Sequence, residues 1–370
     1  MFGYRPVSRG SGAHIGIGQQ LMSSYPTPLG FCDLSSSATK SIRGALLGLG
    51  MIGRHHARLL QSSPRVRFAG AVDPGGDRYG VIHDPSLVFD SLEDLLRAGV
   101  PDFAIIAVPT EFHLAAVREL AEHGVNVIVE KPLAATSEEA DELIEICRQA
   151  SVIGAVGHVE RFNPALLELR RRAQAGQVGE VFSISTTRVG PFPDRIRDVG
   201  VVKDLATHDL DLVRWLGDSP VASVAAQTQH RTGREHEDQV FITGSLQSKV
   251  SFNCTVDWLT PMKIRRMNIL GEKGMLVADT LASELYFYEN GQLQEGWEAT
   301  QQFKGVSEGN MTRYALSRRE PLLVEHETFV DLLLGDQTAE VVSLQDGLDA
   351  VRCAEGVLQS ANTGETVKLT

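Results

Sequence analysis

The sequence has few cysteines, no long hydrophobic run and no excess of positive charge. Its four cysteines, Cys32, Cys147, Cys254 and Cys353, lie far apart and form no Cys-x-x-Cys pair, so they indicate neither a disulfide scaffold nor a zinc site. No apolar run approaches the roughly 18 residues that a membrane-spanning helix needs. The formal net charge of −12 argues against nucleic acid or an anionic membrane as a partner of the surface as a whole. We therefore expect a soluble, cytoplasmic protein.

Residues 1–40 differ in composition from the rest of the chain. They are rich in Gly and Ser and contain a single acid, Asp33, and they lack the apolar segment of a secretory signal. We expect a disordered or misassigned N-terminal extension, with an organelle transit peptide as the alternative. The length of 370 residues favours two domains over one. Because the pattern changes near residue 160, we expect these domains at 41–160 and 161–370.

Between residues 41 and 160, apolar runs rich in β-branched residues alternate with helical patterns, which is typical of a parallel sheet built from βαβ units. A first strand ends in RGALLGLG, and further strands are predicted at 68–73, 102–109, 126–132 and 153–159. In the helix before the last of these strands, Thr136 and Glu139 have the spacing of a capping box.

Beyond residue 160 the pattern changes to long alternating strands. In KVSFNCTVDWL, apolar residues such as Phe252 and Val256 alternate with polar residues such as Asn253 and Asp257, which predicts a sheet packed on one face only. Asn290-Gly291 has the composition of a hairpin turn. The predicted fold class is α/β, with an N-terminal Rossmann domain followed by an α/β domain that has an open, mostly antiparallel sheet.

The motif GLGMIG follows an apolar strand and precedes a helical pattern, as in dinucleotide-binding folds. The residues of the motif that we expect to bind the cofactor are Gly48, Gly50, Met51, Ile52 and Gly53. Asp73 ends the next predicted strand, where its carboxylate can accept hydrogen bonds from an adenosine ribose and would repel a 2′-phosphate. NAD is therefore favoured, and Arg78 keeps NADP as an alternative. The remaining alternative is an ordinary glycine turn beside an unrelated acid.

The tripeptide EKP, at residues 130–132, falls at the carboxyl end of a predicted parallel strand. Open α/β sheets bind their ligands at this edge. Lys131 could hold a hydroxyl or carbonyl oxygen there and exchange a proton with it. The alternative is a surface lysine before a proline that forms a turn.

Residues 201–216, VVKDLATHDLDLVRWL, have the pattern of an amphipathic helix. Asp204 lies one helical turn before His208, so both can face one cleft, whereas Asp209 and Asp211 point elsewhere and are expected at the helix surface or behind the site. A metal site would need more converging ligands than these. A buried histidine with solvated aspartates is a second alternative. A catalytic pair is favoured once EKP and the dinucleotide motif are counted.

From residue 43 to about residue 369, the sequence resembles the glucose-fructose oxidoreductase and inositol dehydrogenase family of sugar dehydrogenases. The motifs that carry the resemblance are GLGMIG, AVPTEFH at 107–113, EKP, GHVERFNP at 157–164 and the Asp-x-x-x-His-Asp that begins at Asp204. The resemblance implies a Rossmann domain and an α/β domain whose open sheet often supports homo-oligomers.

The resemblance also implies roles for individual residues. By the family pattern Lys131, Asp204 and His208 are catalytic, and a cis bond is expected before Pro132. The further residues that we expect in the cofactor site are Pro109, Thr110, His113 and Glu130, together with Lys131.

Within the family, HVERFNPAL and the long segment from Arg188 to Leu216 are most similar to the UDP-N-acetylglucosamine 3-dehydrogenases and related nucleotide-sugar 3-dehydrogenases. The basic side chains of this region suit a diphosphate or a sugar carboxylate. The residues that we expect to bind substrate, besides Asp204 and His208, are Arg161, Asn163, Arg188 and Arg195. The alternatives are salt bridges to neighbouring aspartates for the arginines of the 188–203 loop and a helix cap for Asn163.

The activity that the resemblance implies is NAD-dependent oxidation of the sugar 3-hydroxyl of a UDP-N-acetylhexosamine, either UDP-N-acetylglucosamine or its uronate. We expect His208 to accept the hydroxyl proton, Lys131 to hold the same oxygen and Asp204 to orient both, with the first proton acceptor left open between Lys131 and His208. The 3-keto product would feed a separate aminotransferase. The alternatives are a dehydrogenase of a free sugar or inositol, and a non-catalytic NAD-binding regulator.

Overall fold

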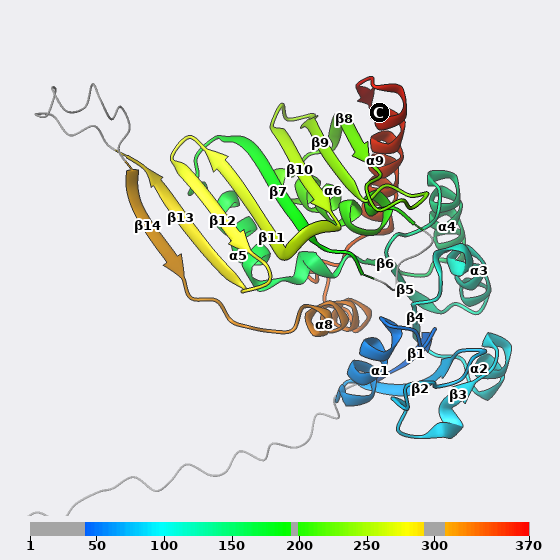
Figure 1. The fold of residues 1–370 in the computed structure, drawn as a ribbon. Coiled ribbons are helices and arrows are strands. Elements are labelled where there is room, and N and C mark those ends of the chain that lie inside the picture. The colour runs from blue at the N-terminus through cyan, green and yellow to red at the C-terminus, as the bar shows by residue number, and fades with distance from the viewer. Residues whose placement is uncertain (1–40, 194–198, 292–307, 370) are drawn as a thin grey trace, which may run out of the picture. The chain divides into compact units, whose positions relative to one another are not determined.

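The computed structural model describes residues 41–193, 199–291 and 308–369. The predicted N-terminal extension at 1–40 and the predicted substrate residue Arg195 lie outside these ranges. Lys40–Thr370 form one unit, and its described residues contain two sheets (Figure 1). In the described part of the chain, no helix is long and apolar enough to cross a membrane.

The first sheet contains six strands within the described residues. They are β1 (Ile42–Leu47), β2 (Val66–Val72), β3 (Val88–Phe89), β4 (Phe103–Ile106), β5 (Asn126–Glu130) and β6 (Gly154–Gly157). They are all parallel and lie in the order β3-β2-β1-β4-β5-β6, which is the doubly wound order of dinucleotide-binding folds. The predicted Rossmann fold is confirmed. With only two residues, β3 was too short to be predicted.

Four helices accompany this sheet. They are α1 (Gly53–Ser62), α2 (Leu92–Ala98), α3 (His113–Glu122) and α4 (Ser137–Ala150). The predicted capping box at α4 is half right, because the Thr136 side chain accepts the Glu139 N–H, whereas the Glu139 carboxylate accepts from Ala135 and not from Thr136.

The second sheet contains nine strands within the same ranges. They are β7 (Val181–Pro191), β8 (Val221–Gln229), β9 (Gln239–Leu246), β10 (Ser251–Asp257), β11 (Leu259–Gly271), β12 (Gly274–Asp279), β13 (Glu284–Asn290), β14 (Glu308–Tyr314) and β15 (Val367–Lys368). Their order is β14-β13-β12-β11-β7-β10-β9-β8-β15, and β7 and β10 are the one parallel pair among the described strands of this sheet. The predicted, mostly antiparallel sheet is confirmed. The turn predicted at Asn290-Gly291 begins at the last residue of β13, and the residues after Gly291 lie outside the described ranges.

Helices cover one face of the second sheet, as the alternating pattern predicts. They are α5 (Pro164–Gln174), α6 (Thr207–Gly217) and α9 (Leu344–Thr363), and they lie behind the sheet in Figure 1. On β10, Phe252 and Val256 are buried beneath these helices and Asn253 is exposed. Asp257 departs from the pattern and is buried, because its carboxylate accepts the N–H groups of Leu259 and Thr260.

The chain returns to the first sheet through α8 (Pro321–Leu333). Phe329 of this helix packs edge-on against Phe103 of β4, and it belongs to the same hydrophobic cluster as α1. This helix therefore places residues from the end of the chain beside the Rossmann sheet, next to the strands that carry the candidate site.

Candidate active site

The glycine motif forms the turn between β1 and α1, and its glycines have different physical tasks. Gly48 has a φ of +93°, and a Cβ there would lie 2.5 Å from the Ala107 carbonyl oxygen. A Cβ on Gly53 would lie 2.0 Å from the Gly48 carbonyl oxygen. A Cβ on Gly50 would meet no protein atom within 4 Å. Gly48 and Gly53 are therefore required by the turn itself, whereas Gly50 leaves the space open in which a pyrophosphate can approach the backbone.

Asp73 lies just after β2 and is anchored to this turn. Its two carboxylate oxygens accept the N–H groups of Leu49, at 2.8 Å, and Gly75, at 2.7 Å. A carboxylate has about four acceptor positions, so the half-buried Asp73 can still accept from ribose hydroxyls. Arg78 is exposed, and its Nε donates to the Gly75 carbonyl at 3.4 Å. These residues fit the adenosine end of NAD.

A cavity of about 720 Å³ lies beside the carboxyl ends of β4 and β5. Residues that line it include Ile52, Pro109, Thr110, Glu130, Lys131, Lys203, Asp204 and His208. The cavity therefore brings together the residues of the glycine turn, the 107–113 loop, EKP and the 201–216 segment that the sequence pointed to separately.

Lys131 and Asp204 are in contact inside this cavity. The Lys131 Nζ donates to the Asp204 carbonyl oxygen at 2.8 Å and to Asp204 Oδ1 at 3.3 Å. The two side chains are 18% and 12% exposed, so the contact is largely shielded from water. The Lys131–Pro132 bond is cis, as the family pattern implied.

His208 lies in the same cavity and is held neutral. Burial and the positive charge of Lys131 lower its pKa well below its ordinary value. Its ring lies edge-on against the buried His158, with 6.3 Å between the ring centroids. His208 Nδ1 and Asp204 Oδ2 are buried and have no hydrogen-bond partner among the described residues. A neutral imidazole in this position can accept a proton.

The segment that carries Asp204 and His208 is helical, with a local difference from the prediction. Val202–Ala206 form a π-helical turn, and α6 begins after it at Thr207. Such single wide turns often occur at functional sites. Both side chains nevertheless line one cavity. No group of three or more His, Cys, Asp or Glu side chains suited to a metal ion occurs within the described ranges.

Comparison with known proteins identifies the family. Residues 42–158 match the oxidoreductase family with an NAD-binding Rossmann fold, and residues 166–277 match the GFO/IDH/MocA C-terminal domain. The UDP-N-acetylglucosamine 3-dehydrogenase of Acidithiobacillus ferrooxidans is 30% identical over 253 residues, which are 68% of this chain and 78% of that protein. The chain belongs to the GFO/IDH/MocA family of oxidoreductases.

Solved structures and a second relative support the same assignment. The structure of the Acidithiobacillus ferrooxidans enzyme has a TM-score of 0.76 at 26% identity, covering 87% of this chain and 98% of that one. The scyllo-inositol 2-dehydrogenase (NAD(+)) of Bacillus subtilis is 30% identical over 206 residues, which are 50% of this chain and 56% of that enzyme. The WlbA dehydrogenase from Bordetella pertussis, solved in complex with NADH and UDP-GlcNAcA, shares the fold, with a TM-score of 0.72 at 22% identity over 90% of this chain and 98% of that one.

These findings confirm the predicted family, fold and NAD cofactor. They also support NAD-dependent oxidation of a sugar as the activity of this GFO/IDH/MocA protein. The glycine turn agrees with the cofactor, because the space above Gly50 is open and Asp73 has acceptor positions to spare.

Two aspartates of this GFO/IDH/MocA protein are buried in α6. Asp209 and Asp211 are 2% and 1% exposed, so the helix-surface alternative was wrong, and a buried position outside the described cavity lining agrees with the alternative behind the site. Asp209 accepts from Arg188 Nε at 2.7 Å, and Asp211 accepts a two-pronged contact from Arg161. Buried carboxylates need such partners, since an unpaired buried charge costs several kcal/mol, on the order of 3–5.

Three predicted substrate residues are absent from the lining described for the 720 Å³ cavity. Arg188 is 5% exposed and also contacts Glu160 at 2.9 Å. Asn163 accepts the Ala165 N–H at 3.0 Å and so caps α5, which confirms the helix-cap alternative. Arg188 does form a salt bridge with an aspartate, Asp209.

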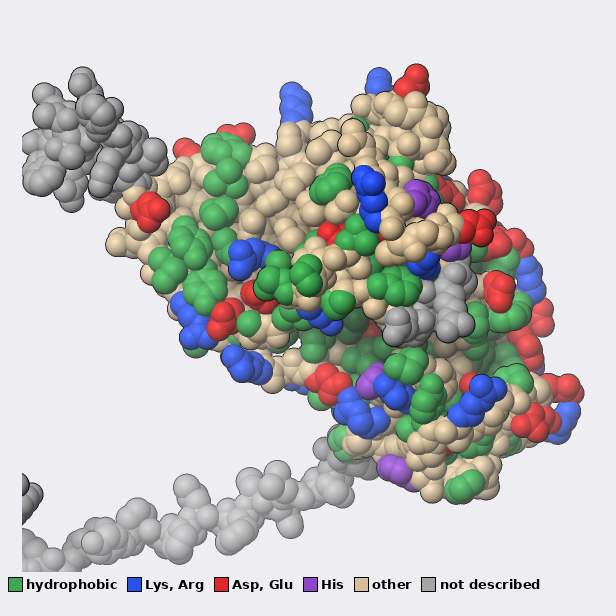
Figure 2. Space-filling model, viewed as in Figure 1, with side chains coloured by type: hydrophobic (Ala, Val, Ile, Leu, Met, Phe, Trp, Pro, Cys, Tyr) green, Lys and Arg blue, Asp and Glu red, His purple; other side chains and the backbone are tan. Residues whose placement is uncertain are grey.

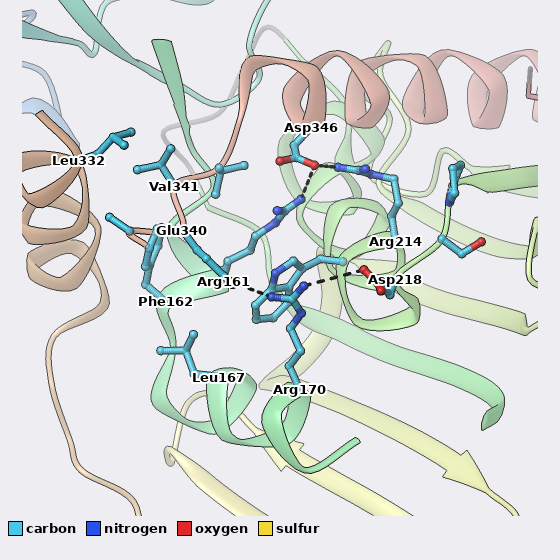
Figure 3. A pocket seen from close by; sticks show the side chains of 15 residues that line it. Arg161, Phe162, Leu167, Arg170, Arg214, Asp218, Leu332, Glu340, Val341 and Asp346 are labelled. Carbon is cyan, nitrogen blue, oxygen red and sulfur yellow. Dashed lines mark hydrogen bonds and ion pairs between the residues drawn. The ribbon is translucent and has the colours of Figure 1, made fainter. Parts of the chain in front are cut away.

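Arg161 belongs to a different cavity, of about 650 Å³, shown in Figure 3. There its guanidinium lies between Asp211 and Asp346, and Arg214 also contacts Asp346. Arg161 and Arg170 both lie over the Trp215 ring. The arginines of this second cavity are thus occupied by carboxylates, and the lining described for it includes none of the three predicted catalytic residues.

His113 is buried and links the 107–113 loop to the segment that follows EKP. It is 1% exposed, and its ring nitrogens face the carbonyl oxygens of Val108, at 3.1 Å, and Leu133, at 3.2 Å. Burial lowers its pKa, so the ring is neutral. His113 therefore joins the loop that carries Pro109 and Thr110 to the segment after EKP, and it is absent from the described cavity lining.

Sequence reasoning missed the partners of Glu130. His56 is fully buried, and its Nε2 lies 2.9 Å from Glu130 Oε1 while its Nδ1 lies 2.8 Å from His326 Nε2. Burial alone would raise the pKa of Glu130, but the His56 hydrogen bond and the charge of Lys131 outweigh it and lower that pKa. His56 and His326 are 270 residues apart in sequence, so no local spacing could have indicated this contact.

Proposed function

We propose that this protein oxidises the 3-hydroxyl of a UDP-N-acetylhexosamine, either UDP-N-acetylglucosamine or its uronate, to the 3-keto sugar. The observation that carries the proposal is the Lys131–Asp204 contact beside the neutral His208, in the cavity that Ile52 of the glycine turn also lines. A proton acceptor and a cation for the hydroxyl oxygen thus lie together next to the cofactor-binding turn.

Each of the three side chains has a task that follows from its surroundings. NAD, when bound, supplies the hydride acceptor. His208 takes the hydroxyl proton, because its imidazole is neutral and its Nδ1 has no partner in the described ranges. The Lys131 ammonium stabilises the negative charge that develops on the oxygen. Asp204 holds Lys131 in place through two oxygens, which favours His208 over Lys131 as the first proton acceptor.

The substrate class is supported by the relative from Acidithiobacillus ferrooxidans, which matches 68% of this chain. A cavity of about 720 Å³ is also within the usual range of about 300–1,000 Å³ for sites that enclose a small ligand. The 3-keto sugar would then be consumed by a separate aminotransferase, because a ketone is the substrate that such an enzyme needs.

A panel of UDP-sugars tests this proposal. Each UDP-sugar is incubated with NAD, the protein and an aminotransferase that removes the keto product, and the absorbance of NADH is recorded. Turnover is expected with UDP-N-acetylglucosamine or its uronate. Lys131→Ala should lose turnover by about 10²–10³-fold, as when an oxyanion-stabilising donor is removed, while NAD binding is retained. No turnover with any UDP-sugar would contradict the proposal.

Oxidation of a free sugar or inositol is the second candidate. The similarity to the scyllo-inositol 2-dehydrogenase of Bacillus subtilis favours it. It requires turnover without UDP on the substrate, so the same assay with inositols and free sugars separates the two candidates. A non-catalytic regulator would have no use for Lys131, Asp204 and His208 together, and any turnover argues against it.

We also propose that copies of this chain associate through the open face of the second sheet. The strand register places Leu270, Met275, Tyr288 and Met311 side by side across β11 to β14. Leu270, Tyr288 and Met311 are 41%, 39% and 58% exposed, and Figure 2 shows hydrophobic side chains gathered over this end of the sheet. A contiguous exposed apolar patch supports a protein interface.

The position of the domain boundary and the cellular location stay proposals. A boundary near residue 160 is supported by the end of β6 at Gly157 and the start of α5 at Pro164. A cytoplasmic location is supported by the buried, free thiols of Cys147, Cys254 and Cys353.

A further inference from the structure

Lys203 lines the candidate active site one residue before Asp204. It lies in the π-helical turn Val202–Ala206, and its Nζ donates to the carbonyl oxygen of Ala135 at 3.3 Å. Ala135 also lines the cavity and follows the EKP segment. The Lys203 ammonium group is therefore placed at the wall of the same cavity that holds the catalytic cluster.

Lys203 and Lys131 differ in the partners of their ammonium groups. Lys131 contacts the Asp204 carboxylate, and the Glu130 carboxylate is hydrogen bonded to His56. The contact that Lys203 makes among the described residues is with a neutral carbonyl, and no carboxylate lies within salt-bridge distance of it there. A half-buried ammonium group with a neutral partner gains more from an anion, because the attraction between opposite charges is then added and is screened less than in bulk water.

Two of the arginines that the sequence suggested for an anionic substrate, Arg161 and Arg188, are not available for this role. Arg188 is bound to Asp209 and Glu160, and Arg161 is bound to Asp211. Replacing those buried contacts by a substrate would leave carboxylates unpaired in the interior, which is costly. Within the described part of the cavity lining, the basic side chains are Lys131 and Lys203, and Lys131 is committed to the reacting oxygen.

We propose that Lys203 binds the diphosphate of the nucleotide-sugar substrate and gives the site its preference for nucleotide sugars over free sugars. This inference rests on the proposed function and adds a residue that determines specificity. Lys203 exchanges the Ala135 carbonyl for a phosphate oxygen when the sugar occupies the space beside Asp204 and His208. A free sugar has no group to make this contact and gains nothing from Lys203.

The test uses UDP as the probe, so that it does not depend on turnover. Isothermal titration measures the Kd of UDP for the wild-type protein, Lys203→Gln and Lys203→Arg, with the exposed Lys368→Gln as a matched control for loss of one surface charge. Lys203→Gln should raise the Kd of UDP by about 10- to 100-fold, the value of a charged hydrogen bond, and should raise the KM of UDP-N-acetylglucosamine in parallel. Lys203→Arg should retain most of the affinity, and Lys368→Gln should retain all of it.

Three results would overturn the inference. They are equal UDP affinity in Lys203→Gln and wild type, a loss of UDP affinity matched by an equal loss of NAD affinity or melting temperature, and a wild-type protein that does not bind UDP. The outcome is distinct from that of the proposed function. A wild-type protein that oxidises UDP-sugars while Lys203→Gln binds UDP normally would remove the inference and leave the function in place.

Discussion

His208 is surrounded by groups that disfavour its protonated form. Burial contributes most to the lowering of its pKa, and the positive charge of Lys131 follows. A base with a lowered pKa loses its proton at a lower pH, so the active, neutral form is present throughout the neutral range. In the mechanism that we propose, the protonation state of this residue gives the reaction its dependence on pH.

We expect kcat/KM to stay constant from pH 8 down to the ordinary histidine value of about 6.5 and to fall only at lower pH. His208→Asn should lose most of the activity and remove this acid limb, because no base then titrates. The measurement is a pH profile of kcat/KM for both proteins at constant ionic strength. An acid limb centred at or above the ordinary histidine value would contradict the environment described for His208.

The buried carboxylate of Asp211, in α6, accepts two hydrogen bonds from the Arg161 guanidinium. Asp211→Asn removes one of the two negative partners of the buried Arg161 guanidinium. Because Asp346 remains beside that guanidinium, we expect the free energy of unfolding to fall by about 1.5–3 kcal/mol, the range for hydrogen bonds to a charged group. Asp218→Asn is the matched control, since the Asp218 side chain is 82% exposed and Asn tolerates its left-handed backbone. Its effect should stay within about 0.5 kcal/mol. Urea unfolding of both variants measures the difference, and equal stability would contradict the pairing.

At the scale of single elements, different glycines of the turn between β1 and α1 serve the fold and the cofactor. Gly53→Ala places a Cβ 2.0 Å from the Gly48 carbonyl oxygen, so we expect a lower melting temperature as well as weaker NAD binding. Gly50→Ala places its Cβ in open space. It should keep the melting temperature of the wild type and still weaken NAD binding, because the methyl group occupies the approach of the pyrophosphate.

Thermal unfolding and NAD titration on these two variants provide the comparison, and each serves as the control for the other. Gly50→Ala with unchanged NAD affinity would place the pyrophosphate elsewhere. Gly53→Ala with wild-type stability would show that the turn relaxes without cost.

The elements themselves could be predicted because their signals are local in sequence. The glycine spacing, Asp73 and the strand that ends in EKP lie within one Rossmann unit, and the order of helices and strands follows from such patterns. The contacts of Arg161 with Asp211 and of Arg188 with Asp209 join residues 50 and 21 positions apart. Sequence alone does not show which carboxylate an arginine reaches, so both were expected at the substrate, and the two aspartates were expected in part at the surface.

The position of Lys203 could also not be predicted from the sequence. Its charge was visible in the sequence as part of a basic region, but its place at the cavity wall depends on the π-helical turn and on the Ala135 carbonyl. The predicted cluster of Lys131, Asp204 and His208 came from family motifs, and their common cavity became visible only when the two sheets were placed together.

At the scale of the whole molecule, the open face of the nine-stranded sheet leads to a prediction about assembly. Replacing Tyr288 and Met311 together by lysine puts charge into the apolar row across β13 and β14, and we expect the oligomer to dissociate. Val100→Lys, at a site on the Rossmann side with 44% exposure, is the control and should leave the mass unchanged. Light scattering coupled to size-exclusion chromatography measures the mass, and an unchanged oligomer in the double variant would place the interface elsewhere.

We propose that NAD oxidises C3 of a nucleotide sugar, while Lys131, Asp204 and His208 hold the C3 hydroxyl and take its proton. UDP-N-acetylglucosamine, or its uronate, carrying deuterium at C3 tests it most directly, with mass spectrometry of the sugar and of the reduced cofactor. We expect the deuterium to be recovered in NADH and a 3-keto sugar to form. Lys131→Ala should slow the transfer by about 10²–10³-fold while still binding NAD. Reduced cofactor without deuterium from either substrate, or deuterium retained in all of the sugar, would contradict it.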